Sequence, residues 1–227
     1  MPRVNLSVKA VIFDMDGVIT NTMPDHYWAW KTILHREDVK VDYFDIYTRE
    51  GQKGIESVFE LYAKYKKPVT LVKARTLLKQ KEALFKKHAR MRFVDGSRSF
   101  LKKLRRKNFD LALVTGTSRH EMQRILPSSI FELFDRTVTG SDVKKGKPHP
   151  EPFLKAIKNL NIGSTEAVVI ENAPLGIRSA KEAGLKCIAL TTSLPRKYLK
   201  MADYVFGSFR EMEERVDFQW PGAKDEI

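Results

Sequence analysis

Two aspartates one residue apart, Asp14 and Asp16, directly follow an apolar run in the segment VIFDMDGVITNT at residues 11–22. Two carboxylates placed close together repel each other and resist ionisation. A divalent cation removes that repulsion, and Mg²⁺ prefers oxygen ligands that it commonly shares with a substrate phosphate. The pair would suit a metal site for a phosphorylated molecule, but by itself an Asp-x-Asp-Gly segment is more often a turn with helix-cap or loop acids, so further residues are needed.

Other segments supply residues that suit the same chemistry. Thr115 follows the run FDLALV, Glu171 and Asn172 close the run AVVIEN, and Lys147 lies in the loop KGKPHPEPF. In an open parallel sheet, ligands bind at the carboxyl ends of the strands, so we expect these side chains to meet Asp14 on one rim. A carboxylate, a metal ion, a lysine and backbone amides together form a phosphoryl-transfer site.

The elements that must position these residues alternate along the chain. Short apolar or β-branched runs are typical of buried parallel strands, and they occur at 9–15, 109–116, 136–140, 167–172, 185–192 and 203–206. Helix-like stretches with start and stop signals lie between them, at 96–108, 118–126, 151–161 and 174–184. The alternation predicts an α/β fold with a doubly wound, Rossmann-like parallel sheet.

One segment interrupts the alternation. Residues 23–91 contain no strand-like run, and their apolar patterns are helical in HYWAWKTIL, GIESVFELYAKY and VTLVKARTLLKQKEALFKKHA. We therefore predict an α/β core formed by residues 1–22 and 92–227, with a helical domain inserted at 23–91. The last residues, WPGAKDEI, are expected to form an unpacked end.

Four segments carry a family resemblance. DMDGVITNT, LVTGT, GKPHPEPF and VVIENAPLGIRSAKEAG resemble, in the same order, the four motifs of the haloacid dehalogenase superfamily. Singly, Lys147 could be a solvated lysine and Asn172 a helix cap; their joint order favours one catalytic site. The chain is most similar to the β-phosphoglucomutase-like phosphatases, and the insertion at 23–91 falls where that superfamily carries its helical cap.

The resemblance implies a role for each motif residue. Asp14 is the expected nucleophile that becomes an aspartyl-phosphate, and Asp16 the expected general acid and base. Lys147 and Thr115 complete the implied catalytic set. The transferring phosphoryl group is expected to contact Thr115, Gly116, Thr117 and Lys147. The implied cofactor is Mg²⁺, with ligands from Asp14, Asp16, Glu171 and Asn172.

Two features depart from the family pattern. The fourth motif often ends in two acids, whereas here Asn172 supplies a neutral amide oxygen, so we expect weaker Mg²⁺ binding. In sugar-phosphate mutases of the family, an arginine that grips a second phosphate follows the specificity loop of the cap. The corresponding position here is near Gly54, which favours a phosphatase over a mutase.

The inserted cap is the expected source of substrate choice. Arg49, Glu50 and Lys53 lie in its loop YTREGQKG and are candidates to face the substrate, or else they are solvent-exposed loop charges. His26 either assists protonation of the leaving group at the cap–core hinge or packs beside Trp30, four residues further along the same helix.

The sequence thus predicts a Mg²⁺-dependent phosphatase of a small phosphorylated metabolite, such as a phospho-sugar. The alternative within enzymes is a β-phosphoglucomutase-type mutase. The formal net charge of +13 raises a third class, a basic nucleic-acid-binding module. Because the basic residues are spread over helix-like segments and are not interleaved with aromatic residues in a stripe, nucleic-acid binding is disfavoured.

Bulk composition indicates where the protein works. The chain has 227 residues, of which 42% are hydrophobic and 30% are charged, enough for a packed core. No apolar run is long enough to span a membrane, and the N-terminus lacks a secretory signal. The single cysteine, Cys187, allows no intramolecular disulfide. We expect a cytoplasmic protein, and a monomer.

Overall fold

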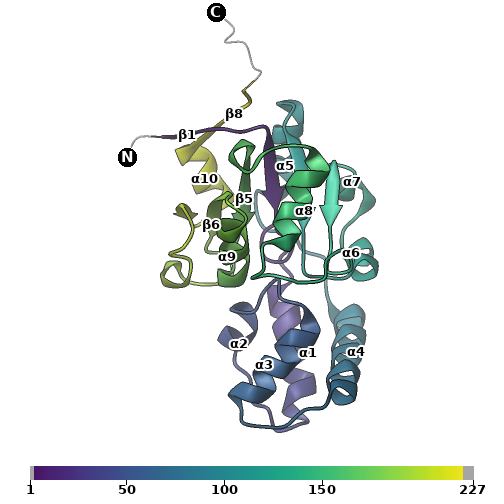
Figure 1. Ribbon diagram of the computed structural model, residues 1–227. Coiled ribbons are helices and arrows are strands. Elements are labelled where there is room, and N and C mark those ends of the chain that lie inside the picture. Colours follow the sequence, from purple (N-terminus) through teal and green to yellow (C-terminus); the bar gives the residue numbers. More distant parts are fainter. Residues whose placement is uncertain (1–2, 222–227) are drawn as a thin grey trace, which may run out of the picture.

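A six-stranded parallel sheet forms the centre of the molecule (Figure 1). The computed structural model describes residues 3–221. The strand order is β4-β3-β2-β5-β6-β7, so the first of these strands in the chain, β2, lies inside the sheet. The strands are β2 (Ala10–Phe13), β3 (Asp110–Val114), β4 (Arg136–Val138), β5 (Ala167–Glu171), β6 (Lys186–Leu190) and β7 (Tyr204–Phe206). The predicted α/β fold with a doubly wound parallel sheet is confirmed.

Helices cover both faces of this sheet. One face packs against α5 (Ser97–Arg106), α6 (Arg119–Ile125), α7 (Ser128–Phe131) and α10 (Phe209–Arg215). The other face packs against α8 (Glu151–Leu160) and α9 (Pro174–Glu182). Two short 3₁₀ turns lie at Ser164–Glu166 and Arg196–Tyr198. Two hydrophobic cores therefore enclose the sheet, one on each side.

The sequence of β2 explains its central place. Successive side chains of a strand point to opposite faces of the sheet. Val11 and Phe13 enter the core on the α5 side, whereas Ala10 and Ile12 enter the core on the α8 side. All four side chains are fully buried, as an uninterrupted apolar run requires.

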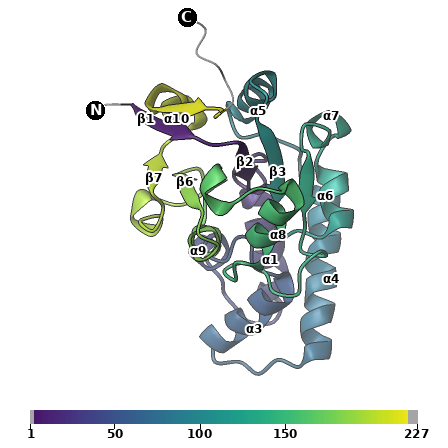
Figure 2. The same ribbon diagram turned by 45° about the horizontal axis from the view of Figure 1, so that its top comes forward.

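The segment between β2 and α5 folds into four helices with a hydrophobic core of their own. They are α1 (Met23–His35), α2 (Tyr43–Tyr47), α3 (Gly54–Lys64) and α4 (Leu71–His88). We call this unit the cap, and Figures 1 and 2 place it on one side of the α/β core. Thr20 and Phe93 pair as an isolated antiparallel bridge where the chain leaves and re-enters the core. α2 is a short helix that the sequence did not predict.

A second, two-stranded parallel sheet was also not predicted from the sequence. β1 (Val4–Ser7) pairs with β8 (Val216–Gln219) and joins the two ends of the described chain. Both strands have only four residues. Their apolar residues alternate with polar ones, with Leu6 buried in β1 and Val216 and Phe218 buried in β8, but runs this short are weak signals of a strand. The predicted unpacked end WPGAKDEI is wrong at Trp220, which packs against the core, and its residues 222–227 lie outside the described part of the chain.

No helix within residues 3–221 is both long enough and apolar enough to cross a membrane. The longest, α4, has 18 residues, and its sequence LVKARTLLKQKEALFKKH is rich in lysine.

Candidate active site

The predicted site residues converge at the carboxyl edge of the sheet. Asp14 directly follows β2, and the register pairs Phe13 with Leu113 of β3 and with Ile170 of β5. The residues that directly follow Phe13, Leu113 and Ile170 therefore lie next to one another across the three strands. Asp14, Asp16, Thr115, Lys147, Glu171 and Asn172 are all buried, with 0–3% of their surfaces exposed. Convergence and burial of so many polar groups is typical of a functional site.

Lys147 lies at the centre of this cluster. Its Nζ donates to Asp14 Oδ1 at 2.6 Å, to Glu171 Oε1 at 2.7 Å and to the Val114 carbonyl at 3.2 Å. Burial opposes the lysine charge, but the two carboxylates outweigh it and hold the pKa of Lys147 above its usual value. Lys147 is therefore a fixed cation, and the interpretation as a solvated lysine is wrong.

Asp14 keeps one oxygen free. Burial, with the Glu171 and Asp16 carboxylates nearby, raises the pKa of Asp14 to about 8 despite the attraction of Lys147. Asp14 Oδ2 and Asn172 Oδ1 are both buried and have no hydrogen-bond partner within residues 3–221. Such orphaned buried oxygens are costly in a folded protein unless something binds them.

A hard cation fits this pair of oxygens. Asn172 Nδ2 donates to Ser193 Oγ at 2.8 Å, which leaves the amide oxygen as the free end of the side chain. A carboxylate oxygen and an amide oxygen are both ligands that Mg²⁺ accepts. Within residues 3–221 no three His, Cys, Asp or Glu side chains form a ready metal cluster, and the Asn172 amide oxygen is a further candidate ligand.

Glu171 is occupied by other partners. Its Oε1 accepts from Lys147, and its Oε2 accepts from the backbone amides of Asn172 and Ala173 at 2.8 and 3.1 Å. Gly176 in α9 allows this arrangement, because a Cβ atom there would lie 1.7 Å from Glu171 Oε1. Glu171 thus orients Lys147 and the start of α9, and its predicted place among the metal ligands stays a prediction.

Asp16 is held by three partners from different segments. Thr22 Oγ1 donates to Asp16 Oδ1 at 2.5 Å, His26 Nε2 lies 3.2 Å from the same oxygen, and Thr117 Oγ1 donates to Oδ2 at 3.1 Å. Burial alone would raise the pKa of Asp16, but His26 and the hydrogen bonds outweigh it and lower that pKa. The carboxyl group is therefore fixed in orientation beside Asp14.

His26 connects Asp16 to the cap. Burial, together with the nearby Lys81 ammonium, lowers the pKa of His26. The neutral ring accepts from Lys81 Nζ at Nδ1, across 3.0 Å, and donates from Nε2 to Asp16. Its ring stacks on Phe85, with ring centroids 4.0 Å apart. These contacts place His26 beside Asp16 and also pack it against Phe85, so its predicted part in protonating the leaving group stays a prediction.

Thr115, Gly116 and Thr117 form the turn after β3. Thr115 Oγ1 accepts from the Thr117 amide at 3.1 Å. Gly116 lies against the cap, since a Cβ atom on it would be 2.5 Å from the Gly51 carbonyl oxygen. The turn therefore joins the carboxylate pair on one side and the cap on the other, and its predicted contact with phosphate stays a prediction.

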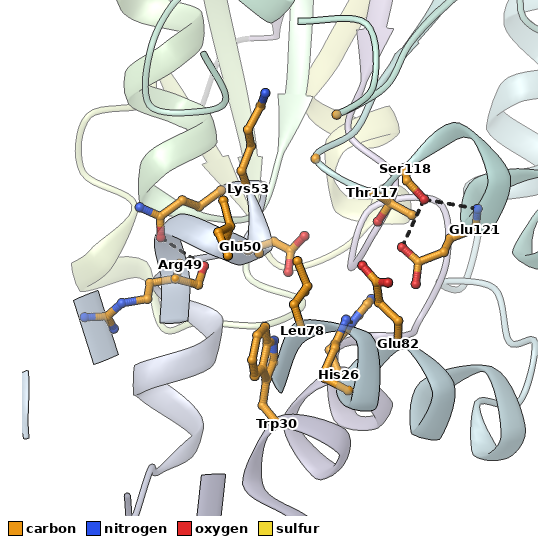
Figure 3. Close-up of a pocket in the computed structure, with 18 of the residues that line it drawn as sticks. His26, Trp30, Arg49, Glu50, Lys53, Leu78, Glu82, Thr117, Ser118 and Glu121 are labelled. Atoms are coloured by element: carbon orange, nitrogen blue, oxygen red, sulfur yellow. Dashed lines mark hydrogen bonds between the residues drawn. The ribbon is translucent and has the colours of Figure 1, made fainter. Parts of the chain in front are cut away.

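A cavity of about 270 Å³ opens between this turn and the cap (Figure 3). This volume is just below the ~300–1,000 Å³ that is typical of pockets for drug-sized ligands, so the cavity suits a compact metabolite. The three charged loop residues predicted to face the substrate, Arg49, Glu50 and Lys53, line it. Arg49 pairs with Glu60 at 3.2 Å, and Lys53 Nζ donates to the carbonyls of Val143 and Lys144. Of these three residues, Glu50 alone directs its charged group into the cavity, as Figure 3 shows.

Two residues of the site escaped the sequence analysis. Thr22 lies in the first motif, DMDGVITNT. Its hydroxyl group, six residues after Asp16, is the feature of the sequence that could have identified it as a partner of Asp16. Lys81 lies in the middle of a lysine-rich helix, and nothing in the local pattern separates it from its solvated neighbours. Yet Lys81 is 7% exposed, and only the packing of α4 against α1 reveals its contact with His26.

Comparison with known proteins agrees with this geometry. Residues 11–190 match the family described as haloacid dehalogenase-like hydrolase. A validoxylamine A 7'-phosphate phosphatase from Streptomyces hygroscopicus subsp. limoneus is 28% identical over 219 residues, which cover 94% of this chain and 97% of that protein. A phosphorylated carbohydrates phosphatase from Thermotoga maritima is 31% identical over 191 residues, 80% of this chain and 84% of its own length.

A solved structure shows the same fold. The candidate β-phosphoglucomutase from Bacteroides vulgatus superimposes with a TM-score of 0.80 and 29% identity, over 92% of this chain and 88% of that one. The match spans the α/β core and the cap alike. The chain therefore belongs to the haloacid dehalogenase-like hydrolases, and within them it is β-phosphoglucomutase-like, with an inserted helical cap.

Proposed function

We propose that this protein is a Mg²⁺-dependent phosphatase that hydrolyses a small phosphorylated metabolite through an aspartyl-phosphate on Asp14. One observation carries the proposal. Lys147 holds one oxygen of Asp14, the other oxygen, like Asn172 Oδ1, is buried and has no hydrogen-bond partner within residues 3–221, and Asp16 lies two residues away, fixed by three hydrogen-bond partners.

The residues divide the reaction into two displacements. Asp14 attacks phosphorus, and the bond from phosphorus to the leaving oxygen breaks while Asp16 gives that oxygen its proton. Asp16 then takes a proton from water as the water oxygen attacks phosphorus, and the Asp14 carboxylate is released. Lys147 offsets the charge on Asp14 and on the phosphoryl group throughout.

The same residues would hold the metal ion. Asp14, the Asp16 backbone carbonyl and Asn172 are the proposed ligands, and Glu171 supports them through Lys147 and the backbone of Asn172. When bound, Mg²⁺ offsets the negative charge that gathers on the phosphoryl oxygens. The two orphaned oxygens supply the support for this placement.

The relatives support a small phosphorylated substrate. Two of them are named as phosphatases, one for validoxylamine A 7'-phosphate and one for phosphorylated carbohydrates. The cavity beside Glu50 has room for a compact leaving group and is lined by residues of both cap and core. A phospho-sugar or a similar polyol phosphate is the proposed class.

A sugar-phosphate mutase is the second candidate, favoured by the likeness to the candidate β-phosphoglucomutase. A mutase must grip a second phosphate. Gly54 stands where the mutases carry the arginine for that task, and the two cations of the same loop, Arg49 and Lys53, have protein partners. These contacts favour hydrolysis over transfer.

The test is hydrolysis of a panel of phosphate monoesters by the purified protein with Mg²⁺ and with a chelator. We expect turnover that needs Mg²⁺ and falls about 10³-fold or more in Asp14→Asn, as losses of nucleophiles do. Asp110→Asn, at the far end of β3, is the matched control and should keep its activity. Substantial hydrolysis by Asp14→Asn would overturn the proposal. With β-glucose 1-phosphate and a trace of the bisphosphate, free phosphate indicates a phosphatase, and glucose 6-phosphate indicates a mutase.

A further inference from the structure

A second cavity, of about 450 Å³, lies at the joint between cap and core. It is lined by α4 of the cap, by α6 of the core and by the connection at residues 89–91, and Figures 1 and 2 both place α6 beside the end of α4. Its volume lies within the ~300–1,000 Å³ that is typical of ligand pockets. We call it the joint cavity, and its lining includes Thr22, Lys86, Arg90, Met91, Arg124 and Ile125.

Basic side chains from both units line the joint cavity. Within residues 3–221, Lys86 and Arg90 have neither a hydrogen bond nor an ion pair. Arg124 Nη1 donates to His120 Nε2 at 3.1 Å, and the accepting ring nitrogen does not offset the arginine charge. Four lining residues therefore carry a fixed positive charge, namely Lys79, Lys86, Arg90 and Arg124.

This lack of acidic partners distinguishes the cluster from other cations on the surface of the core. Lys103, for example, pairs with Glu213 at 2.7 Å, and Arg105 pairs with Asp135 at the same distance. A cation that has an acidic partner is already compensated within the protein. The cations of the joint cavity are free to bind an anion from solution.

Two carboxylates also line the joint cavity, Glu82 of α4 and Glu121 of α6. Both line the catalytic cavity as well, where Figure 3 shows them, whereas none of the four cations does. Ser118 Oγ donates to Glu121 Oε2 at 3.3 Å, which holds that carboxylate toward the turn after β3. The excess of positive charge therefore lies in the part of the joint cavity that is separate from the catalytic cavity.

An anion with an apolar part fits this lining. Cations of the cap and of the core repel one another across the joint, and a negative group between them replaces that repulsion by attraction. Arginine and lysine are the residues that proteins use to bind phosphate groups. Beside them, Met91 is 39% exposed and Ile125 is half-buried, so an apolar surface is available to the rest of a ligand.

We propose that the joint cavity binds a phosphate monoester, with its phosphate group on Lys86, Arg90 and Arg124 and an apolar body over Met91 and Ile125. Asp14 and Lys147 do not line this cavity, so it is a binding site and not a second catalytic site. Because its cations come from both units, the ligand bridges cap and core and favours the arrangement in which they touch. The inference does not depend on the proposed hydrolysis.

Calorimetric titrations with phenyl phosphate and with inorganic phosphate, in the presence of a chelator, test this site. Without a metal ion, the carboxylates of Asp14, Asp16 and Glu171 repel anions from the catalytic cavity. We expect phenyl phosphate to bind wild type at least about threefold more tightly than inorganic phosphate, because its ring covers the apolar wall. A double variant, Lys86→Gln with Arg124→Gln, should raise the Kd for phenyl phosphate at least about tenfold, since two charge-assisted contacts are lost.

Lys87→Gln with Arg106→Gln is the matched control. It removes the same charge at two exposed residues that do not line the cavity, and its Kd should equal that of wild type. No binding to wild type, or an equal loss of affinity in both double variants, would overturn the site. Equal affinities of wild type for the two phosphates would overturn the assignment of a monoester with an apolar body. Because binding is measured without turnover, these outcomes are independent of whether the protein hydrolyses any substrate.

Discussion

At the scale of single residues, Asn172 is the proposed ligand that should decide how tightly the site holds a metal ion. Its amide oxygen is buried and has no hydrogen-bond partner within residues 3–221, and its amide nitrogen donates to Ser193 Oγ. An amide oxygen coordinates Mg²⁺ without contributing a negative charge, and the affinity of such sites depends on the charge of their ligands. We therefore expect the neutral residue to limit Mg²⁺ affinity without abolishing binding.

Asn172→Asp should lower the Mg²⁺ concentration that gives half-maximal hydrolysis by about five- to tenfold, because one more negative charge faces the ion. Mg²⁺ titrations of activity and of Tm both measure the change, since a ligand of the folded state raises Tm. Gln123→Glu, on the exposed face of α6, adds the same charge elsewhere and should leave the requirement unchanged. An unaltered requirement in Asn172→Asp would count against Asn172 as a ligand.

At the scale of elements, the short helix α2 depends on one buried carboxylate. Five residues are too few for a helix that is stable by itself. Asp45 in α2 caps the helix start together with Asp42, accepts from Lys64 Nζ, and accepts from Tyr65 Oη at 2.7 Å. Asp45 thus fastens α2, and the loop that follows it, to the end of α3.

The pKa of Asp45 lies below its usual value because its hydrogen bonds from Lys64, Tyr65 and the Asp42 amide outweigh the effect of burial. A lowered pKa means stability that is present above pH ~4 and lost as the pH falls through the folded-state value. Asp45→Asn should therefore lower the free energy of unfolding by about 1–3 kcal/mol at pH 7. Urea titrations should give the same difference in free energy of unfolding between wild type and Asp45→Asn at pH 5, and a smaller difference below pH 4. A difference that persists at pH 3 would assign the effect to neutral contacts.

At the scale of the whole molecule, the proposed active site lies where cap and core touch. His26, Lys81 and Glu50 come from the cap, whereas Asp14, Asp16 and Lys147 come from the core. Gly51 and Gly116 bring the backbones of the two units into direct contact, since neither residue carries a side chain. Because this contact sets the position of Glu50 and of the turn after β3, small separations of the units should impair catalysis.

Gly116→Ala tests that expectation. The new Cβ atom would lie 2.5 Å from the Gly51 carbonyl oxygen, so the cap must move away from the core. We expect kcat/KM to fall about ten- to 100-fold, as misplacement by about 1 Å can cause, while Tm changes little because cap and core have separate hydrophobic cores. Gly163→Ala, whose Cβ atom would meet only ordinary contacts, is the control. Activity of Gly116→Ala within twofold of wild type would show that tight closure is unnecessary.

The sequence alone determined the fold class and the polar residues that meet at the carboxyl edge of the sheet. Apolar runs that end on Asp14, Thr115 and Glu171 are local features, and the geometry of parallel sheets requires such ends to meet. The absence of strand-like runs between β2 and α5 likewise identified the helical insertion. These inferences succeeded because backbone pattern and strand register leave few alternative arrangements.

Only the tertiary structure decided which polar side chains make contacts inside the protein and which groups they contact. Lys81 and Lys53 look like solvated lysines in the sequence, yet one contacts His26 and the other binds carbonyls across the cap–core boundary. The pairing of β1 with β8, from opposite ends of the chain, was also not predicted, because the alternation of apolar and polar residues in each short strand does not identify its partner. Contacts between distant segments depend on how whole elements pack, and a short polar stretch does not encode its partner.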